Sequence, residues 1–139
     1  MSINNKINDM KDMFLVFDNP MDKYLQIIEL GKNNAGLNDI DKTNENRIFG
    51  CASLAWVKTT KNNNTYSIQI DSDTFIVKGL LNILQYIIKE STKKEILNLK
   101  VRIILENIGL EQSITSQRTN GFLGALDKIK NQINNNEYK

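Results

Sequence analysis

Residues 54–71 read LAWVKTTKNNNTYSIQID, and this pattern predicts the β-sheet that decides the fold class. Tyr66, Ile68 and Ile70 alternate with polar residues, which is typical of a strand with one buried and one solvated face. The polar run at residues 61–64 predicts a hairpin turn between two strands. We expect three antiparallel strands, at residues 47–50, 54–60 and 65–71.

Helical spacing marks the segments before this sheet. Apolar side chains recur every three or four residues over residues 3–17, which predicts a first helix. The Asn-Pro pair at residues 19–20 is a typical helix start, and Gly31 is a typical helix end. A second helix is therefore expected to about Leu30, followed by a surface loop over residues 32–46.

Helical spacing also marks the segments after the sheet. Residues 74–90 are the most apolar part of the chain and predict a central helix, with Asp73 as its N-cap. Gly79, Gly121 and Gly124 fall inside predicted helices, where glycine indicates close packing against a neighbouring element. We expect further helices at residues 92–97 (opened by a Thr92–Glu95 capping box), 102–107 (stopped near Gly109) and 117–133, with a frayed tail at residues 134–139.

Strands that are clustered, with helices before and after them, predict an α+β fold: a three-stranded antiparallel sheet with helices packed against it. At 139 residues the chain is expected to form a single domain, residues 1–139, with its core at about residues 20–133. The sequence has no apolar run long enough to predict a membrane span, and the polar N-terminus does not resemble a signal peptide. We therefore expect a cytoplasmic protein that does not bind a membrane.

The composition excludes several kinds of chemistry. The net charge is +2, with 18 basic and 16 acidic residues spread along the chain, which argues against nucleic-acid binding. There is no histidine, so neither a Ser-His-Asp triad nor a Cys-His dyad can form. A single cysteine cannot by itself hold an iron–sulfur cluster or a structural zinc, so we expect no resident cofactor or metal.

That single cysteine, Cys51, is the candidate functional residue. A lone cysteine is often a small buried hydrophobe, so the residue type alone does not assign a role. Cys51 lies at a predicted junction between strands, where functional residues are common, and it follows Gly50, which can adopt conformations that other residues avoid. Arg118 and Asp73 lie near predicted element ends and are candidates to surround the thiol.

The segment around Cys51, Gly50-Cys51-Ala52-Ser53-Leu54-Ala55-Trp56, resembles the Gly-Cys-x-Ser-x-Val-Trp signature of the SufE family. The departures from the family pattern are small: Ala55 replaces a usual valine, and Thr74 a usual alanine. Three other blocks resemble the family in the same order, at residues 22–31, 72–80 and 116–121.

The resemblance implies a fold similar to that of IscU-type scaffolds and a role in iron–sulfur cluster assembly. Cys51 would accept sulfur from the persulfide of a cysteine desulfurase of the SufS or CsdA type, and pass it to an iron–sulfur scaffold of the SufB type. Asp73 and Arg118 would help to shape the site. The protein would activate the desulfurase, would have no independent turnover, and would be a monomer or weak dimer.

The chemistry of sulfur transfer sets expectations for the site. A thiolate is the attacking species, so Arg118 is a candidate cation to lower the pKa of Cys51, or alternatively a structural partner of Asp71 or Asp73. The apolar Leu54 and Trp56, with the small Ala52, are expected to form a pocket that conceals the sulfur. The Cys51 segment would then have to move outward for transfer.

Other functions remain open at this point. An IscU-like scaffold would need several cysteines, and a thiol peroxidase usually has a resolving thiol, while this chain has one cysteine. A desulfurase-binding adaptor without sulfur relay is compatible with the sequence and would not require the Cys51 thiol.

Overall fold

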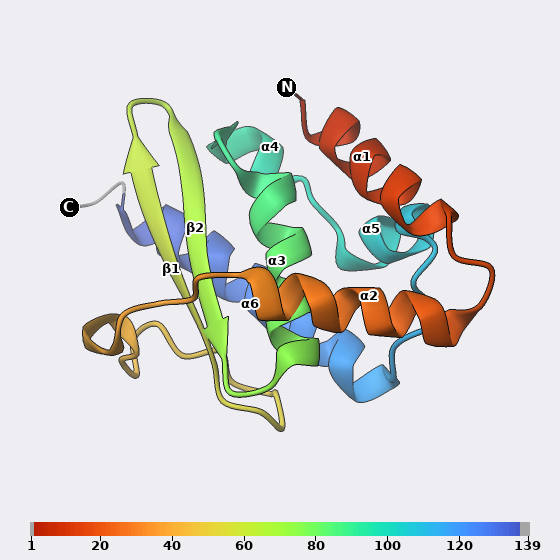
Figure 1. Ribbon diagram of the computed structural model, residues 1–139. Coiled ribbons are helices and arrows are strands. Elements are labelled where there is room, and N and C mark those ends of the chain that lie inside the picture. The colour runs from red at the N-terminus through yellow and green to blue at the C-terminus, as the bar shows by residue number, and fades with distance from the viewer. Residues whose placement is uncertain (1, 137–139) are drawn as a thin grey trace.

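The computed structural model describes residues 2–136, and they form the expected α+β fold (Figure 1). A three-stranded sheet is ordered β1-β2-β3, and both pairings are antiparallel. The elements, in chain order, are α1 (Ile3–Leu15), α2 (Pro20–Asn33), the 3-10 turn η1 (Asp39–Asp41), β1 (Ala55–Asn62), β2 (Thr65–Ser72), α3 (Phe75–Ile88), β3 (Ser91–Thr92), α4 (Lys93–Leu97), α5 (Val101–Ile108) and α6 (Ser116–Asn136).

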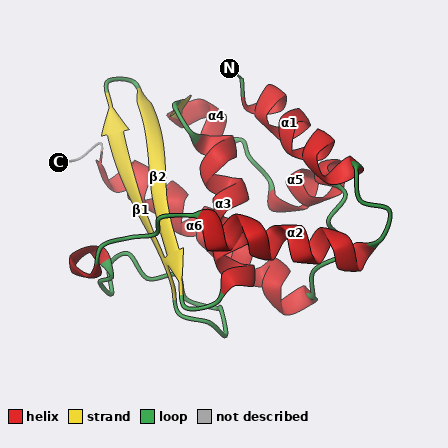
Figure 2. Ribbon diagram, viewed as in Figure 1, coloured by secondary structure: helices red, strands yellow, loops and turns green. Residues whose placement is uncertain are grey.

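The β1–β2 hairpin confirms the strongest strand prediction. Ala55 pairs with Ser72 at one end and Asn62 with Thr65 at the other. The turn is shorter than expected, because both strands continue into the asparagine run and Asn63 takes a left-handed φ of 57° that asparagine tolerates. Figure 2 shows this hairpin at one side of the molecule, with helices filling the rest.

The third strand is not the one expected. Residues 47–50 form only an isolated bridge, between Arg47 and Trp56, before the chain turns at Gly50. The strand that completes the sheet is β3, which pairs with β2 through Thr65–Thr92 and Tyr66–Ser91. A two-residue strand carries no periodicity of its own, so its position depends on where α3 returns the chain.

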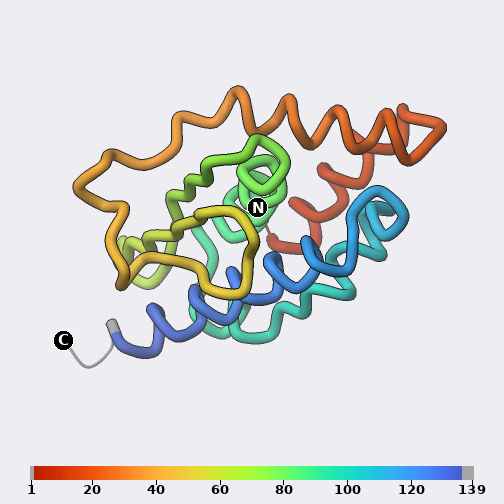
Figure 3. The backbone as a smooth tube through the Cα atoms, turned by 90° about the horizontal axis from the view of Figure 1, so that it is seen from below, coloured from red at the N-terminus to blue at the C-terminus, as the bar shows by residue number. Residues whose placement is uncertain are grey.

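Helix α3 is the centre of the core, as its apolar sequence predicted. Ile83, Leu84, Ile87 and Ile88 are fully buried. Figure 3 shows α2 along one side of α3 and α6 along the other.

Helices α2 and α3 pack with their backbones in close approach. A Cβ added at Gly79 would overlap the carbonyl oxygen of Ile27, and one added at Gly31 would overlap the carbonyl oxygen of Phe75. The prediction that Gly31 ends α2 is therefore wrong. Gly31 is needed for helix contact, and α2 continues to Asn33.

Most predicted helix ends are confirmed. The side chain of Asn19 accepts a hydrogen bond from the backbone N–H of Asp22, and Thr92 with Glu95 forms a complete capping box. Gly109 ends α5 in a left-handed conformation, with φ 81°. The tail differs, because α6 continues through the first three residues expected to fray, and residues 137–139 lie outside the described part of the chain.

Candidate functional site

Cys51 lies in a loop, residues 48–54, that joins the Arg47 bridge to strand β1. We call this segment the Cys51 loop. Gly50 has φ +93°, and apart from its two chain neighbours no atom of the described residues would lie within 4 Å of an added Cβ, so backbone conformation and not space requires glycine there. The loop thereby turns back on itself, and the half-buried Cys51 side chain points inward.

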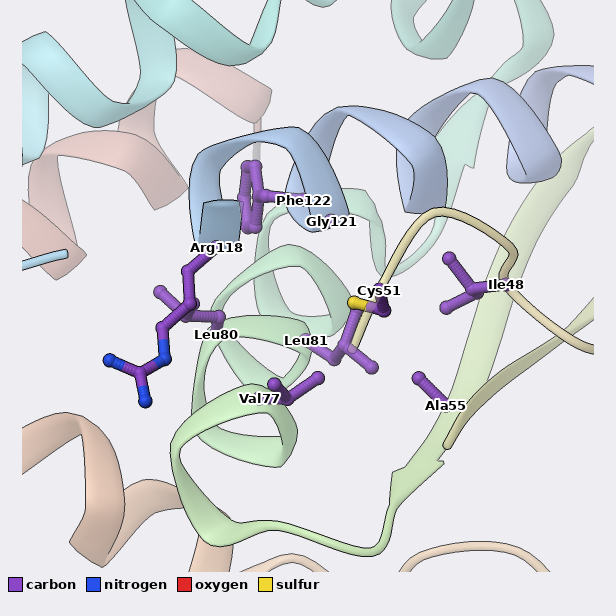
Figure 4. A pocket seen from close by; sticks show the side chains of 9 residues that line it. All are labelled: Ile48, Cys51, Ala55, Val77, Leu80, Leu81, Arg118, Gly121 and Phe122. Carbon is purple, nitrogen blue, oxygen red and sulfur yellow. The ribbon is translucent and has the colours of Figure 1, made fainter. Parts of the chain in front are cut away.

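The thiol lies in a small apolar cavity between the loop and two helices (Figure 4). The cavity has a volume of about 10 Å³, which is space for about one water-sized atom. Its walls come from the loop and β1 (Ile48, Cys51, Ala55), from α3 (Val77, Leu80, Leu81) and from α6 (Arg118, Gly121, Phe122).

The apolar surroundings change the acidity of the thiol. Burial raises the pKa of Cys51 above its ordinary value, because a thiolate in this cavity would lose its hydration. At neutral pH the inward-facing thiol is therefore protonated and a poor nucleophile. The prediction that a nearby cation lowers this pKa does not describe this conformation of the loop.

Helix α6 approaches the loop through two glycines on one face. A Cβ added at Gly121 would overlap the Sγ atom of Cys51, and one added at Gly124 would lie 3.0 Å from the carbonyl oxygen of Phe49. The expectation that both glycines mark close packing is confirmed, and the structure identifies the Cys51 loop as the neighbour.

Asp73 holds the end of the Cys51 loop and does not cap α3 by its side chain. Its Oδ1 atom accepts a hydrogen bond of 3.0 Å from the backbone N–H of Leu54, and its own N–H donates to the Leu54 carbonyl at 3.1 Å. The N-cap position of α3 belongs to Thr74, and no side chain bonds there. The predicted capping role is therefore wrong, because the neighbouring strand end competes successfully for the carboxylate.

Two further hydrogen bonds fasten the same end of the loop. The Ser72 hydroxyl donates to the Leu54 carbonyl at 2.8 Å, and the hydroxyls of Ser53 and Thr74 lie 3.1 Å apart. The other end is held where the Ile48 N–H donates to the Ala55 carbonyl at 2.8 Å. Between these anchors, no hydrogen bond joins residues 49–52 to the rest of the described chain.

The Arg118 side chain lines the cavity, but its charged group does not face the thiol. Figure 4 shows the guanidinium directed away from the Cys51 sulfur. The guanidinium carbon lies 5.7 Å from the centre of the Tyr24 ring, a cation–π distance. Within the described residues no ion pair joins Arg118 to Asp71 or Asp73, so the alternative structural tie is not formed either.

Asp71 has different partners, which explains why it is not available to Arg118. Its carboxylate is 3.3 Å from Lys42 and 3.5 Å from Lys78, and it accepts hydrogen bonds from the backbone N–H groups of Leu37 and Ser72. Burial by itself would raise the pKa of Asp71, but these hydrogen bonds and lysine charges lower it overall. The cluster ties the 32–46 loop to β2 and α3.

The pocket predicted from residues next to Cys51 in sequence is wrong. Leu54 is 40% exposed, Ala52 is exposed, and half-buried Trp56 packs beneath Lys42, whose Nζ lies 5.4 Å from the ring centre. Alternation along β1 explains this, because Ala55 and Val57 face the core and Trp56 must face away. The walls missed by sequence reasoning are on α3 and α6, in residues that helical spacing marked only as core.

Two apolar side chains of the Cys51 loop itself are exposed. Phe49 is 64% exposed and Leu54 is 40% exposed. The loop that carries the half-buried thiol therefore also presents apolar surface.

Some kinds of site are not found. Across residues 2–136 no group of three or more His, Cys, Asp and Glu side chains could hold a metal ion. In the same part of the chain, the helices are too short or too polar to span a lipid bilayer.

The fold and the loop-borne thiol define a small α+β domain with one sheltered cysteine. The family described as "SufE: Fe-S metabolism associated domain" matches residues 8–133, nearly the whole sequence. The chain therefore belongs to the SufE family, whose domain is associated with iron–sulfur metabolism.

A solved structure supports the fold independently. A hypothetical protein from Thermus thermophilus is similar with a TM-score of 0.77, covering 96% of this chain and 97% of its own. The two sequences are 14% identical, so the similarity describes the fold and not the function.

Proposed function

We propose that Cys51 accepts a sulfur atom from the persulfide of a cysteine desulfurase and carries it to an iron–sulfur cluster scaffold. The observation that carries this proposal is the position of the thiol: it lies in an apolar cavity of about 10 Å³, with room for about one more atom. A persulfide differs from a thiol by one sulfur atom. Sequestering it there would keep it from reductants between two partners.

The transfer is an exchange between two thiols, without net oxidation. The Cys51 thiolate attacks the terminal sulfur of the desulfurase persulfide and forms a new S–S bond. The bond between that sulfur and the desulfurase cysteine breaks, and the desulfurase cysteine leaves as a thiolate. Cys51 then carries the persulfide, which a scaffold's acceptor can take by the same exchange.

The inward position of Cys51 requires that the loop open for this attack. Residues 49–52 make no hydrogen bond to the rest of the described chain, while both ends of the loop are anchored. An outward rotation about the anchors would therefore break few polar contacts. It would also rehydrate the thiol and remove the burial that raises its pKa, so that more thiolate forms.

The surroundings of the loop suit a partner that induces this opening. Exposed Phe49 and Leu54 in the loop offer apolar contact, and the Arg118 guanidinium lies outside the cavity, where it could meet an outward-facing sulfur anion. In this role the protein activates the desulfurase and has no turnover of its own. We place the exchange in the cytoplasm, where a lone thiol stays reduced.

The test is transfer of sulfur to the isolated chain. The protein is mixed with a cysteine desulfurase and cysteine, and its intact mass is measured without reductant. We expect a gain of one sulfur atom in the native protein and none in Cys51→Ser. An unchanged native mass in the presence of a desulfurase that binds the chain would contradict the proposal.

The same variant separates the sulfur acceptor from a pure adaptor. A protein that acts only by binding would still stimulate the desulfurase as Cys51→Ser, whereas a sulfur acceptor would not. Binding of the variant to the desulfurase, measured by calorimetry, is the control that the docking surface is intact.

A further inference from the structure

Gly121 is a glycine that the local backbone does not need. It lies inside α6 and is not among the described glycines with positive φ, so an alanine could take its conformation and would favour the helix. Among residues 2–136, the only atoms outside its own helix that lie within 4 Å of an added Cβ belong to the Cys51 side chain, and the nearest is Sγ. The lack of a side chain at Gly121 therefore makes room for the Cys51 thiol.

We propose that Gly121 is a positioning residue that sets how much of the time the Cys51 sulfur is sheltered. This inference rests on the proposed function. The Cys51 sulfur packs directly against the α6 backbone at Gly121, and any side chain at this position would compete with the sulfur for the same space.

The Cys51 loop is the element that would yield to such a side chain. On the other side of the cavity Leu81 is 2% exposed, and Phe122, next to Gly121 in α6, is also 2% exposed, so the helices are tightly packed. The loop tip, residues 49–52, is held by no hydrogen bond to the rest of the described chain. An alanine methyl at position 121 would therefore push Cys51 outward while both loop anchors stay in place.

The first test measures access to the thiol in the chain alone. Cys51 of Gly121→Ala is labelled with a bulky maleimide, and the rate is compared with that of the native protein. If the native loop is open about 0.1–10% of the time, the variant should react about tenfold to a thousandfold faster. The pH midpoint of labelling should also fall towards the ordinary thiol value of about 8.5, because an outward-facing thiol is hydrated.

Gly124→Ala is the matched control. It makes the same exchange one helical turn further along α6, but its nearest neighbour is the Phe49 carbonyl and not the thiol. Because this contact is milder, at 3.0 Å, and presses on the same loop without touching the sulfur, we expect a clearly smaller acceleration than in Gly121→Ala. Equal acceleration in both variants, or an unchanged rate in Gly121→Ala, would overturn the proposal.

A double variant tests the same contact through stability. In Cys51→Ala the sulfur is absent, so the methyl of Gly121→Ala should fit into the vacated space. We expect Gly121→Ala to lower the urea midpoint in the native background and to leave it unchanged or raise it in the Cys51→Ala background. An equal fall of the urea midpoint in both backgrounds would overturn the proposal, even if Gly121→Ala alone were too unstable to label.

These results are separable from the proposed function, because none of them uses a desulfurase. If Gly121→Ala reacts faster but no sulfur is ever transferred to Cys51, the positioning role of Gly121 stands and the sulfur-acceptor role fails. If sulfur is transferred but Gly121→Ala is labelled at the native rate, the acceptor role of Cys51 stands and the positioning role of Gly121 is wrong.

Discussion

The hydrogen bond between Asp73 and Leu54 should control how readily the Cys51 loop opens. The Asp73 carboxylate accepts from the Leu54 N–H at 3.0 Å, at the point where the loop joins β1. Replacing Asp73 with alanine removes this acceptor and leaves the reciprocal backbone bond, from the Asp73 N–H to the Leu54 carbonyl, as an anchor. The change should weaken the closed loop without unfolding the domain.

The size of the effect follows from the exposure of this contact. A hydrogen bond to a charged acceptor contributes about 1.5–3 kcal/mol when it is buried, but this one is exposed to solvent, so about 1 kcal/mol is a reasonable value. That free energy corresponds to about a fivefold rise in the open population. Labelling of Cys51 by a bulky maleimide should accelerate by the same factor, because the reagent reaches only the open state.

Asp73→Asn is the matched control for this prediction. Asparagine keeps an oxygen acceptor at the same position, so it should preserve most of the bond and label nearly as slowly as the native protein. Labelling of Asp73→Ala at the native rate, in a chain whose circular dichroism is unchanged, would refute the reasoning. Equal acceleration in both variants would instead assign the effect to the lost charge.

Two other predictions concern ionisation. Asp71→Asn should lower the free energy of unfolding by about 1–3 kcal/mol near neutral pH, because Lys42 and Lys78 lose the buried negative charge that they contact. The exposed Asp12→Asn is the control. An unchanged free energy of unfolding of Asp71→Asn in urea titrations would contradict a stabilising role for the cluster. Since the folded-state pKa of Asp71 lies below its unfolded value of about 3.9, this contribution is present above that pH and disappears as the pH falls through the folded pKa. For Cys51, whose folded-state pKa is raised, the closed loop should be stable below the ordinary thiol pKa of about 8.5 and should lose stability as the pH rises beyond it. The alkylation rate of the native protein should therefore follow an apparent pKa above the ordinary thiol value, and in urea this apparent pKa should return to the ordinary value. An ordinary midpoint in the folded chain would contradict an inward-facing, desolvated thiol.

The elements that the sequence predicted well depend on neighbours in the chain. The cap at Asn19, the Thr92–Glu95 capping box and the stop at Gly109 each involve residues within a few positions of one another. The β1–β2 hairpin is similar, because its alternation and turn lie within one continuous segment. The Gly50–Trp56 motif also identified the family without any structure, because motif and spacing are properties of the sequence itself, while the role of Cys51 stays a prediction.

The arrangement around the thiol was decided only by tertiary structure. The cavity joins Cys51 to Val77 on α3 and Gly121 on α6, which are 26 and 70 residues away in the chain, so no local pattern relates them. The same holds for Asp73 and Arg118: the sequence placed both near the site, but competing partners decided that one fastens the loop and the other directs its charge away from the sulfur. By itself the sequence determined which residue has the single thiol, Cys51. Packing between distant elements determined that this sulfur is concealed, because only the folded chain brings an apolar wall and a bare helix backbone against it.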